Sequence, residues 1–196
     1  MVDTNLNYYN QNAKQFSEST LDLDMTRIYN SFLPLVEANG HILDAGCGSG
    51  RDSMYFKELG FSVTALDASE ELVKIASNNI GQPVVHASFN EIAYQNEFDG
   101  IWCCASLLHV PQAELVSVFT KLSTALKYGA ALYFSFKHGE GERSHNGRLF
   151  TDLNESGLEQ LLNHFPEFQM SEAWISSDQR PGREDEMWLN AVVIKV

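Results

Sequence analysis

The sequence predicts an α/β fold, a doubly wound and mostly parallel seven-stranded sheet whose last strand is antiparallel. Short runs rich in β-branched and aromatic residues alternate with stretches of helical periodicity, which is typical of a parallel sheet flanked by helices. The last two predicted strands, 168–177 and 188–196, are joined by a short turn-rich segment. A parallel return would need a crossover of about a dozen residues or more, so the final strand must be antiparallel to the one before it.

The first four strands are predicted at 41–44, 61–67, 84–87 and 98–104. The helix after the first strand ends at Gly60, a residue type that often terminates helices. Ser69 is a natural N-cap for the helix after the second strand. Glu70 and Glu71 follow it in the first turn, where the helix dipole favours acids.

A further helix is predicted to open at Pro111 and to close at Gly129, with an apolar face at Leu115, Phe119, Leu122 and Leu126. The nearly all-apolar run 130–136 predicts a fifth strand that is buried on both faces. One more helical stripe runs from Leu158 to Phe165 and ends at Pro166.

Ahead of the sheet, a stripe predicts a helix packed on it, at Met25, Ile28, Tyr29 and Phe32. The 196 residues fit one domain. We therefore expect a single domain, 1–196, composed of an N-terminal helical lid, 1–38, and an α/β core, 39–196.

Composition excludes several classes of partner. The formal net charge of −13 argues against nucleic acid and against an anionic membrane surface, because both would be repelled. No apolar run approaches the roughly 18 residues of a membrane span, and the first residues are too polar for a signal peptide. The three cysteines are odd in number and two are adjacent, so they form neither a disulfide framework nor a CxxC metal site. We expect a reduced, cytoplasmic protein, as a monomer or homodimer, without a metal.

A glycine loop, Asp44-Ala-Gly46-Cys-Gly48-Ser-Gly50, connects the first strand to a helix. Glycines let the backbone approach a ligand, and the helix N-terminus directs N–H groups at it. Asp67 ends the second strand, 23 residues after Asp44, where an acid typically binds the ribose of a nucleoside. Turns that bind no ligand also contain such glycines, so a ligandless turn remains an alternative.

The charge at Asp44 favours one cofactor over another. A dinucleotide-binding loop has the pattern GxGxxG, whereas here Arg51 follows a GxGxG pattern. A carboxylate at Asp44 would repel a pyrophosphate but would attract a sulfonium and an ammonium group. The loop therefore favours S-adenosylmethionine over NAD, and an NAD-dependent oxidoreductase is the rival enzyme.

The sequence resembles the class I S-adenosylmethionine-dependent methyltransferases, which have a Rossmann-like fold. The segment Tyr8-Tyr-Asn-Gln-Asn-Ala13 is similar to an N-terminal segment of their small-molecule members. The family segment often has Asp at the position that Asn10 occupies here. The strand Phe98-Asp-Gly-Ile-Trp102 and the segment Leu107-Leu-His-Val-Pro111 resemble their fourth strand and following loop. The tail, from Trp174 to Asn190, is similar to that of a small bacterial subgroup related to the tellurite-resistance methyltransferases.

The resemblance implies where the cofactor binds. Gly46, Cys47 and Gly48 would line its methionine part, and Tyr9 and Arg51 would close over that end. Arg51 could instead be an ordinary surface residue of the first helical turn.

The nucleoside half has its own implied contacts, besides the ribose at Asp67. Ala68, Ser88 and Phe89 would border the adenine. Cys104 and Ala105, at the end of the fourth strand, would face the sulfonium and its methyl group.

Two polar loops should reach the substrate side, 137–148 and 177–187, because ligands of open α/β sheets bind at the carboxyl ends of the strands. His109 is the first candidate for a general base, with His138 and Glu140 next. His109 could equally pack or cap the following helix. Four arginines could bind an anionic group of the substrate: Arg143, Arg148, Arg180 and Arg183.

The motifs of DNA-modifying methyltransferases are absent after the fourth strand, where the residues are Cys103-Cys-Ala-Ser106. Together with the negative charge, this favours a small-molecule substrate. Methyl transfer needs no obligatory catalytic residue, so a cofactor-binding sensor or accessory protein without turnover remains a second hypothesis.

Overall fold

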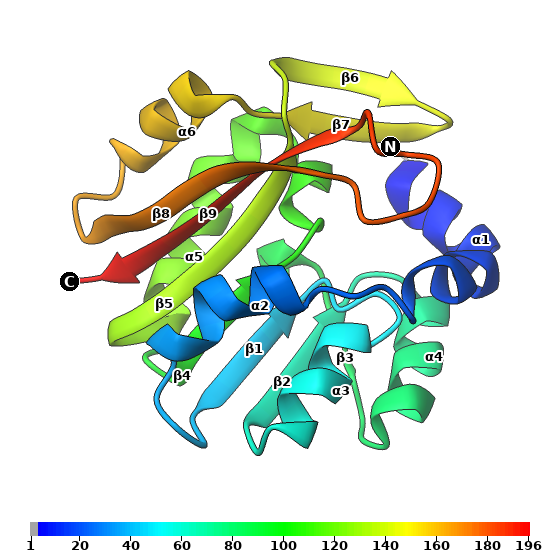
Figure 1. The fold of residues 1–196 in the computed structure, drawn as a ribbon, viewed down its shortest axis with the longest axis horizontal. Coiled ribbons are helices and arrows are strands. Elements are labelled where there is room, and N and C mark those ends of the chain that lie inside the picture. Colours follow the sequence, from blue (N-terminus) through cyan, green and yellow to red (C-terminus); the bar gives the residue numbers. More distant parts are fainter. Residues whose placement is uncertain (1–3) are drawn as a thin grey trace.

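A computed structural model describes residues 4–196 and has an α/β fold built on one seven-stranded sheet (Figure 1). The strand order is β3-β2-β1-β4-β5-β9-β8. The first five strands are parallel, and β9 lies antiparallel between β5 and β8. The predicted fold class is therefore confirmed. The strands are β1 (His41–Ala45), β2 (Ser62–Asp67), β3 (Val85–His86), β4 (Phe98–Cys103), β5 (Leu126–Lys137), β8 (Phe168–Ser177) and β9 (Met187–Lys195).

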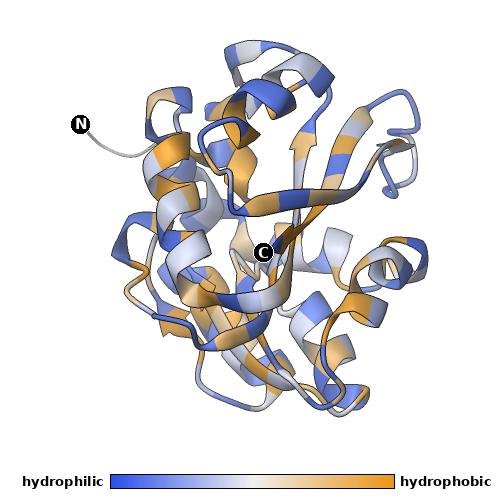
Figure 2. Cartoon of the chain, turned by 90° about the vertical axis from the view of Figure 1, so that its left-hand side faces the viewer, coloured by the Kyte–Doolittle hydropathy of each residue, from blue (hydrophilic) through white to orange (hydrophobic). Residues whose placement is uncertain are grey.

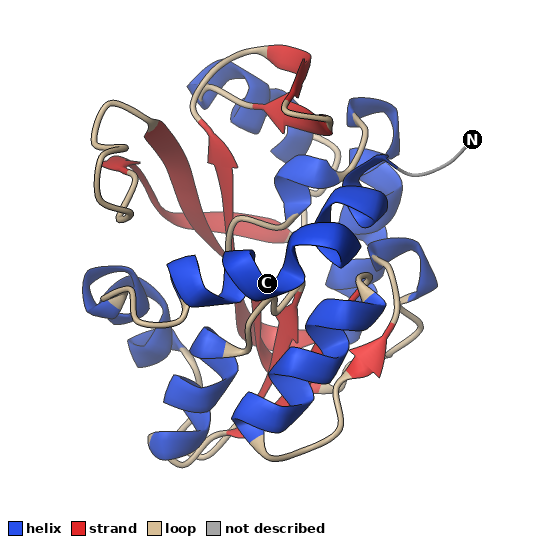
Figure 3. Ribbon diagram, turned by 90° about the vertical axis from the view of Figure 1, so that its right-hand side faces the viewer, coloured by secondary structure: helices blue, strands red, loops and turns tan. Residues whose placement is uncertain are grey.

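Helices cover both faces of the sheet, and Figure 3 shows several of them lying across it. The α-helices are α1 (Thr4–Thr20), α2 (Thr26–Phe32), α3 (Arg51–Glu58), α4 (Glu70–Ile80), α5 (Leu115–Ala125) and α6 (Glu155–Leu162). Four single 3₁₀ turns complete the described part: η1 (Leu33–Leu35), η2 (Phe89–Glu91), η3 (Leu107–His109) and η4 (Gln112–Glu114). Figure 2 shows that hydrophilic residues dominate the loops at the periphery.

Two large hydrophobic clusters hold the layers together. On one face, α5 and α6 bury Phe119, Leu122 and Leu158 against alternate residues of the strands. On the other face, α2 packs on Trp102 through Ile28, Tyr29 and Phe32, as predicted. Gly100 permits this approach, because a Cβ there would come within 2.8 Å of the Phe32 ring.

Two predicted boundaries are wrong. The helix that was predicted to close at Gly129 is α5, and it ends at Ala125 because β5 begins at Leu126. Gly129, with a φ of 81°, instead lies inside β5, opposite the place where its register with β4 shifts between Phe98 and Gly100. An irregularity of this kind needs a residue that tolerates a positive φ. The third strand is also shorter than predicted, since it comprises only Val85 and His86.

A second sheet replaces the loop predicted after the fifth strand. Strands β6 (Gly141–His145) and β7 (Arg148–Asp152) form an antiparallel hairpin beyond the carboxyl ends of the main sheet (Figure 1). Its turn is Asn146-Gly147, and both residues have a positive φ, of 51° and 73°. An Asn-Gly pair is the residue preference of a two-residue hairpin turn, so the sequence does carry a signal for this element.

Candidate cofactor and substrate site

The glycine loop packs tightly against its surroundings. Gly46 and Gly48 have φ values of 81° and 57°, which favour glycine. A Cβ at Gly46 would come within 2.4 Å of Ser106, and one at Gly48 would come within 3.0 Å of the Phe16 ring. The backbone N–H groups of Gly46 and Cys47 donate to the Leu66 carbonyl, at 2.8 and 2.9 Å. The loop thus holds a fixed shape at the carboxyl ends of β1 and β2.

Asp67 connects the glycine loop to the end of β2. One carboxylate oxygen accepts from the Gly48 N–H at 2.9 Å, and the other accepts from the Ser69 N–H at 2.8 Å. Burial raises the pKa of Asp67, and these hydrogen bonds oppose the shift. A carboxylate has about four acceptor positions, so Asp67 keeps acceptor capacity toward a ligand.

Two adjoining cavities open on this loop. The smaller, of about 380 Å³, lies along the ends of β2 and β3. The larger, of about 540 Å³, extends from the glycine loop toward β5, β9 and the β6–β7 hairpin. Six of the described residues line both cavities and form their shared border: Tyr9, Phe16, Gly46, Gly48, Ala105 and His109.

The structure brings together all but one of the residues predicted to contact a cofactor. The smaller cavity is lined by Asp67, Ala68, Ser88 and Phe89. Three others line the larger cavity alone: Cys47, Arg51 and Cys104. The remaining four lie on the shared border: Tyr9, Gly46, Gly48 and Ala105.

Asp44 lies apart, which corrects the charge argument made from the sequence. Its side chain is 1% exposed and lines neither cavity. Strand alternation puts Asp44 on the same face as Ile42, beneath α3, where the Ser53 hydroxyl donates to it at 2.6 Å. Burial, with repulsion from Asp52, raises the pKa of Asp44 to about 8. Its carboxyl therefore supports the loop from behind and does not face the cavity.

The Arg51 side chain is 16% exposed and lines the larger cavity, so it is not the ordinary surface residue that the alternative describes. Its guanidinium donates to both oxygens of Asp52, at 2.6 and 2.9 Å. The same carboxylate accepts from the Tyr29 hydroxyl at 2.5 Å and from the Trp102 indole at 2.8 Å. Burial alone would raise the pKa of Asp52, but the Arg51 charge and these hydrogen bonds lower it.

His109 is held between α1 and the β6–β7 hairpin. The Tyr9 hydroxyl lies 2.7 Å from its Nε2, and the Leu149 carbonyl lies 3.0 Å from its Nδ1. A carbonyl oxygen only accepts, so Nδ1 carries a proton, and in the neutral form of the ring Nε2 accepts from the Tyr9 hydroxyl. His109 lines both cavities. It is thus placed at the site and also joins α1 to the segment after β4.

The other two candidate bases are placed differently. His138 lines the larger cavity, with Nε2 at 3.1 Å from Glu155. Glu140 lines neither cavity and accepts from Asn154 at 2.7 Å, because the turn before β6 directs it toward the N-terminus of α6. The structure therefore gives Glu140 no place at the site.

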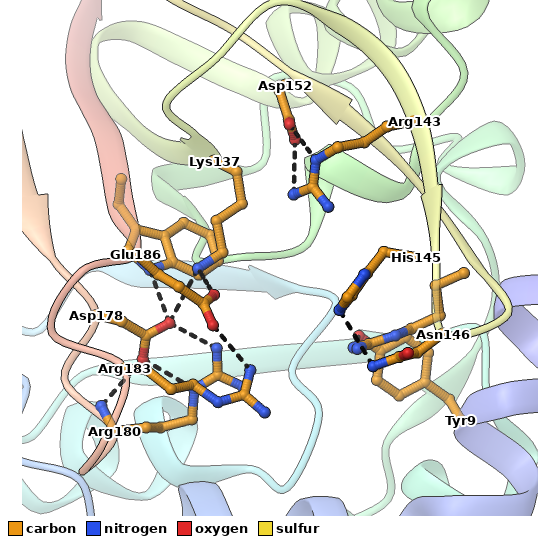
Figure 4. A network of polar contacts seen from close by, with 12 residues as sticks. Tyr9, Lys137, Arg143, His145, Asn146, Asp152, Asp178, Arg180, Arg183 and Glu186 are labelled. Atoms are coloured by element: carbon orange, nitrogen blue, oxygen red, sulfur yellow. Dashed lines mark hydrogen bonds and ion pairs between the residues drawn. The ribbon is translucent and has the colours of Figure 1, made fainter.

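A charged cluster closes the far side of the larger cavity (Figure 4), and the sequence analysis singled out its arginines but not its lysine and acids. Lys137, at the end of β5, pairs with Asp178 at 3.0 Å and with Glu186 at 2.5 Å. Asp178 also accepts from Arg180 and from the Trp188 indole. Burial opposes the charge of Asp178, but its hydrogen bonds to Arg180 and Lys137 lower its pKa. The local signals for this cluster are a lysine that ends an apolar strand and the two arginines of the loop 177–187.

Within residues 4–196, no group of three or more His, Cys, Asp or Glu side chains is arranged to hold a metal ion. None of the described helices has the length and apolar character needed to cross a bilayer.

Comparison with known proteins agrees with this geometry. Residues 42–129 match the family model described as a methyltransferase domain. A putative methyltransferase from Bacillus subtilis is 32% identical over 57% of this chain and 51% of its own length. A ubiquinone biosynthesis O-methyltransferase from Coxiella burnetii is 30% identical over 64% of this chain and 53% of its own length. The chain thus spans about half the length of these curated relatives.

Solved structures resemble the whole chain more closely in shape than in sequence. A Burkholderia thailandensis 1,6-didemethyltoxoflavin-N1-methyltransferase, solved with its acceptor and S-adenosylhomocysteine bound, superposes with a TM-score of 0.77 at 20% identity. That match covers 98% of this chain and 86% of the other. A magnesium protoporphyrin IX methyltransferase from Synechocystis, solved with S-adenosylmethionine bound, has a TM-score of 0.63 at 16% identity and covers 98% and 80% of the two chains.

The chain has the fold of the class I S-adenosylmethionine-dependent methyltransferases along nearly its whole length. The segment that matches the methyltransferase-domain family model, residues 42–129, contains the glycine loop, Asp67 and the end of β4.

The raised pKa of Asp44 leads to a testable pH dependence. The group ionises near pH 4 in the unfolded chain and near pH 8 in the folded one, so the folded state binds more protons between these values. This group therefore makes the protein less stable as the pH rises from about 4 to about 8. We expect Asp44→Asn to lose less stability than the wild type between pH 5 and pH 8, as measured by urea unfolding. An identical pH dependence in both proteins would contradict the assignment.

The hydrogen bond between Tyr9 and His109 can be measured with a double-mutant cycle. Tyr9→Phe and His109→Ala each remove it, so the free energies of unfolding should be non-additive by about 1 kcal/mol. The control cycle pairs Tyr9→Phe with His41→Ala, which lies at the opposite end of the sheet and should show no coupling. Additive effects in the first cycle would show that the two side chains do not stabilise each other.

Proposed function

We propose that this chain binds S-adenosylmethionine and transfers its methyl group to a small-molecule acceptor. The observation that carries this proposal is the pair of adjoining cavities joined at Gly46, Gly48 and Ala105. One cavity has the residues suited to a nucleoside, and the other is large and opens beside the end of β4. The named activities of the curated relatives support the same reaction.

The nucleoside would occupy the smaller cavity. Asp67 would accept from the ribose hydroxyls, because its carboxylate is already oriented by Gly48 and Ser69. The Phe89 ring and Ala68 would border the base. The methionine part would extend along Gly46 and Cys47 toward Arg51 and Cys104 in the larger cavity. All of the predicted cofactor contacts except Asp44 fit this arrangement.

Bound S-adenosylmethionine would supply a methyl group on a positively charged sulfur. The residues of this chain would then position the acceptor in line with that group and exclude water, which is the main requirement of such a displacement. Residues 1–38 would act as the lid, with residues 1–3 outside the described part. Tyr9 and Phe16 support this role, since both border the two cavities.

His109 is the general-base candidate that the geometry favours. Its Nε2 faces Tyr9 on the border of both cavities, so an acceptor hydroxyl or amine that takes the place of the Tyr9 hydroxyl could pass its proton there. His138 would be a second candidate at the acceptor side. The kinship with the tellurite-resistance subgroup stays a prediction from the tail sequence. The location in the cytoplasm and the monomer or homodimer state stay predictions as well.

Two rival functions make different predictions. An NAD-dependent oxidoreductase would bind NADH in place of the sulfonium cofactor. A sensor or accessory protein would bind S-adenosylmethionine without consuming it. The acceptor-sized cavity beside the cofactor residues favours an enzyme over a sensor.

Calorimetric titration with S-adenosylhomocysteine and, in parallel, with NADH tests the cofactor. We expect micromolar binding of S-adenosylhomocysteine and none of NADH. Asp67→Ala should weaken S-adenosylhomocysteine by about tenfold or more, since the ribose loses a charged acceptor and the glycine loop loses its link to β2. Glu71→Gln is the matched control, because it removes an exposed acid outside both cavities and should leave the affinity unchanged.

Unchanged affinity in a folded Asp67→Ala protein would refute the ribose assignment. Binding of NADH alone would overturn the proposed function. Release of S-adenosylhomocysteine during incubation with S-adenosylmethionine and a panel of acceptors would then separate the enzyme from the sensor.

A further inference from the structure

Arg148 differs from every other arginine and lysine that lines the larger cavity. Within residues 4–196, each of the others forms an ion pair with a carboxylate. These pairs are Arg51–Asp52, Lys137–Asp178, Arg143–Asp152, Arg180–Asp178 and Arg183–Glu186. Arg148 forms no such pair among the described residues, so its charge is not neutralised by a neighbouring acid.

Aromatic side chains surround Arg148 instead. Its guanidinium carbon lies 4.3 Å from the Tyr8 ring centre and 5.0 Å from that of Phe150. One terminal nitrogen lies 3.5 Å from the Tyr9 hydroxyl, while the buried Nε has no hydrogen-bond partner in the described part of the chain. A buried donor without a partner is costly, and so is a cation without a counter-ion. Stacking thus holds the guanidinium in place while its Nε donor is still to be satisfied.

We propose that Arg148 binds a carboxylate of the methyl acceptor, so that the acceptor is an anionic small molecule. This inference rests on the proposed function. A planar guanidinium can donate two parallel hydrogen bonds to one carboxylate, which would satisfy both the charge and the free donors.

The position of Arg148 assigns this carboxylate to the acceptor. Arg148, on β7, lines the larger cavity and not the smaller one, and it lies next to the Tyr9 and His109 pair. An acceptor held by Arg148 therefore lies against the candidate base. The methionine carboxylate of the cofactor is the competing source of the same chemistry, and the experiment below distinguishes the two sources.

Charge in the larger cavity also favours an anion. Among residues 4–196, six arginines and lysines line it against five carboxylates, one of which is the exposed Asp185. The chain as a whole carries a net charge of −13. A cavity with a small excess of positive charge, in so acidic a protein, is a local exception that would draw in an anionic ligand. Figure 4 shows the paired cluster around Lys137 on one side of this region and Tyr9 with His145 on the other.

The test measures dissociation constants by ligand-observed NMR for three carboxylates and their neutral amides, with and without saturating S-adenosylhomocysteine. The pairs are benzoate and benzamide, phenylacetate and phenylacetamide, and hexanoate and hexanamide. We expect at least one carboxylate to bind the wild type about tenfold more tightly than its amide. Arg148→Gln should abolish that preference, and Arg148→Lys should restore part of it, because lysine keeps the charge but not the paired geometry.

Arg27→Gln is the control, since it removes the same charge from the exposed face of α2, outside both cavities. It should keep the preference for the carboxylate. Calorimetry with S-adenosylhomocysteine distinguishes the two sources of the carboxylate. The acceptor assignment requires that Arg148→Gln leaves this affinity unchanged.

Several results would overturn the inference: no carboxylate preferred over its amide, a preference that survives in Arg148→Gln, or a loss of S-adenosylhomocysteine affinity in that variant. Failure of the wild type to bind S-adenosylhomocysteine would instead refute the proposed function. A carboxylate preference that depends on Arg148 would, in that case, leave the anion site standing by itself.

Discussion

The buried carboxylate of Asp52 is the interaction on which the site depends. It lies at the start of α3 and accepts hydrogen bonds from Arg51, Tyr29 and Trp102. A buried charge is tolerated only when it is paired and hydrogen-bonded, so these donors must come together for the chain to fold in this way. Because Tyr29 belongs to α2 and Trp102 to β4, a single carboxylate fixes the N-terminal helices to the centre of the sheet. Arg51 extends the link to α1 through the Thr20 carbonyl, at 3.4 Å.

The cavities follow from this anchor. Once the end of α1 is held by Arg51, the helix crosses the carboxyl ends of β1 and β2, so that Phe16 reaches Gly48 and Tyr9 reaches His109. Asn5 fixes the other end of α1 through two hydrogen bonds to the backbone of Leu149, at 2.6 and 3.1 Å. Helix α1 therefore lies between two attachments, one on the sheet and one on the β6–β7 hairpin. The same hairpin carries Arg148, so α1 and the proposed anion site share a support.

The predictable parts of the structure are those that short sequence patterns determine. Alternating strands and helices, the Ser69 cap and the glycine loop with Asp67 all depend on residues close in sequence, and the structure has them where expected. Side-chain direction was harder. The charge argument put Asp44 at the ligand, whereas strand alternation hides it beneath α3. The cluster around Asp178 joins the end of β5 to the connection between β8 and β9, about forty residues further along the chain, and no local pattern reveals these ion pairs. The hairpin was missed although Asn146-Gly147 marks it.

The role of the Asp52 carboxylate is tested most directly by the affinity of Asp52→Asn for S-adenosylhomocysteine, combined with amide hydrogen exchange. An asparagine cannot balance the Arg51 charge, so α1 and α2 should exchange faster while the sheet stays protected, and the affinity should fall by about tenfold or more. Asp22→Asn, which removes an exposed acid between the same helices, should change neither. Wild-type affinity and unaltered exchange in Asp52→Asn would show that the site forms without this anchor and would contradict the account.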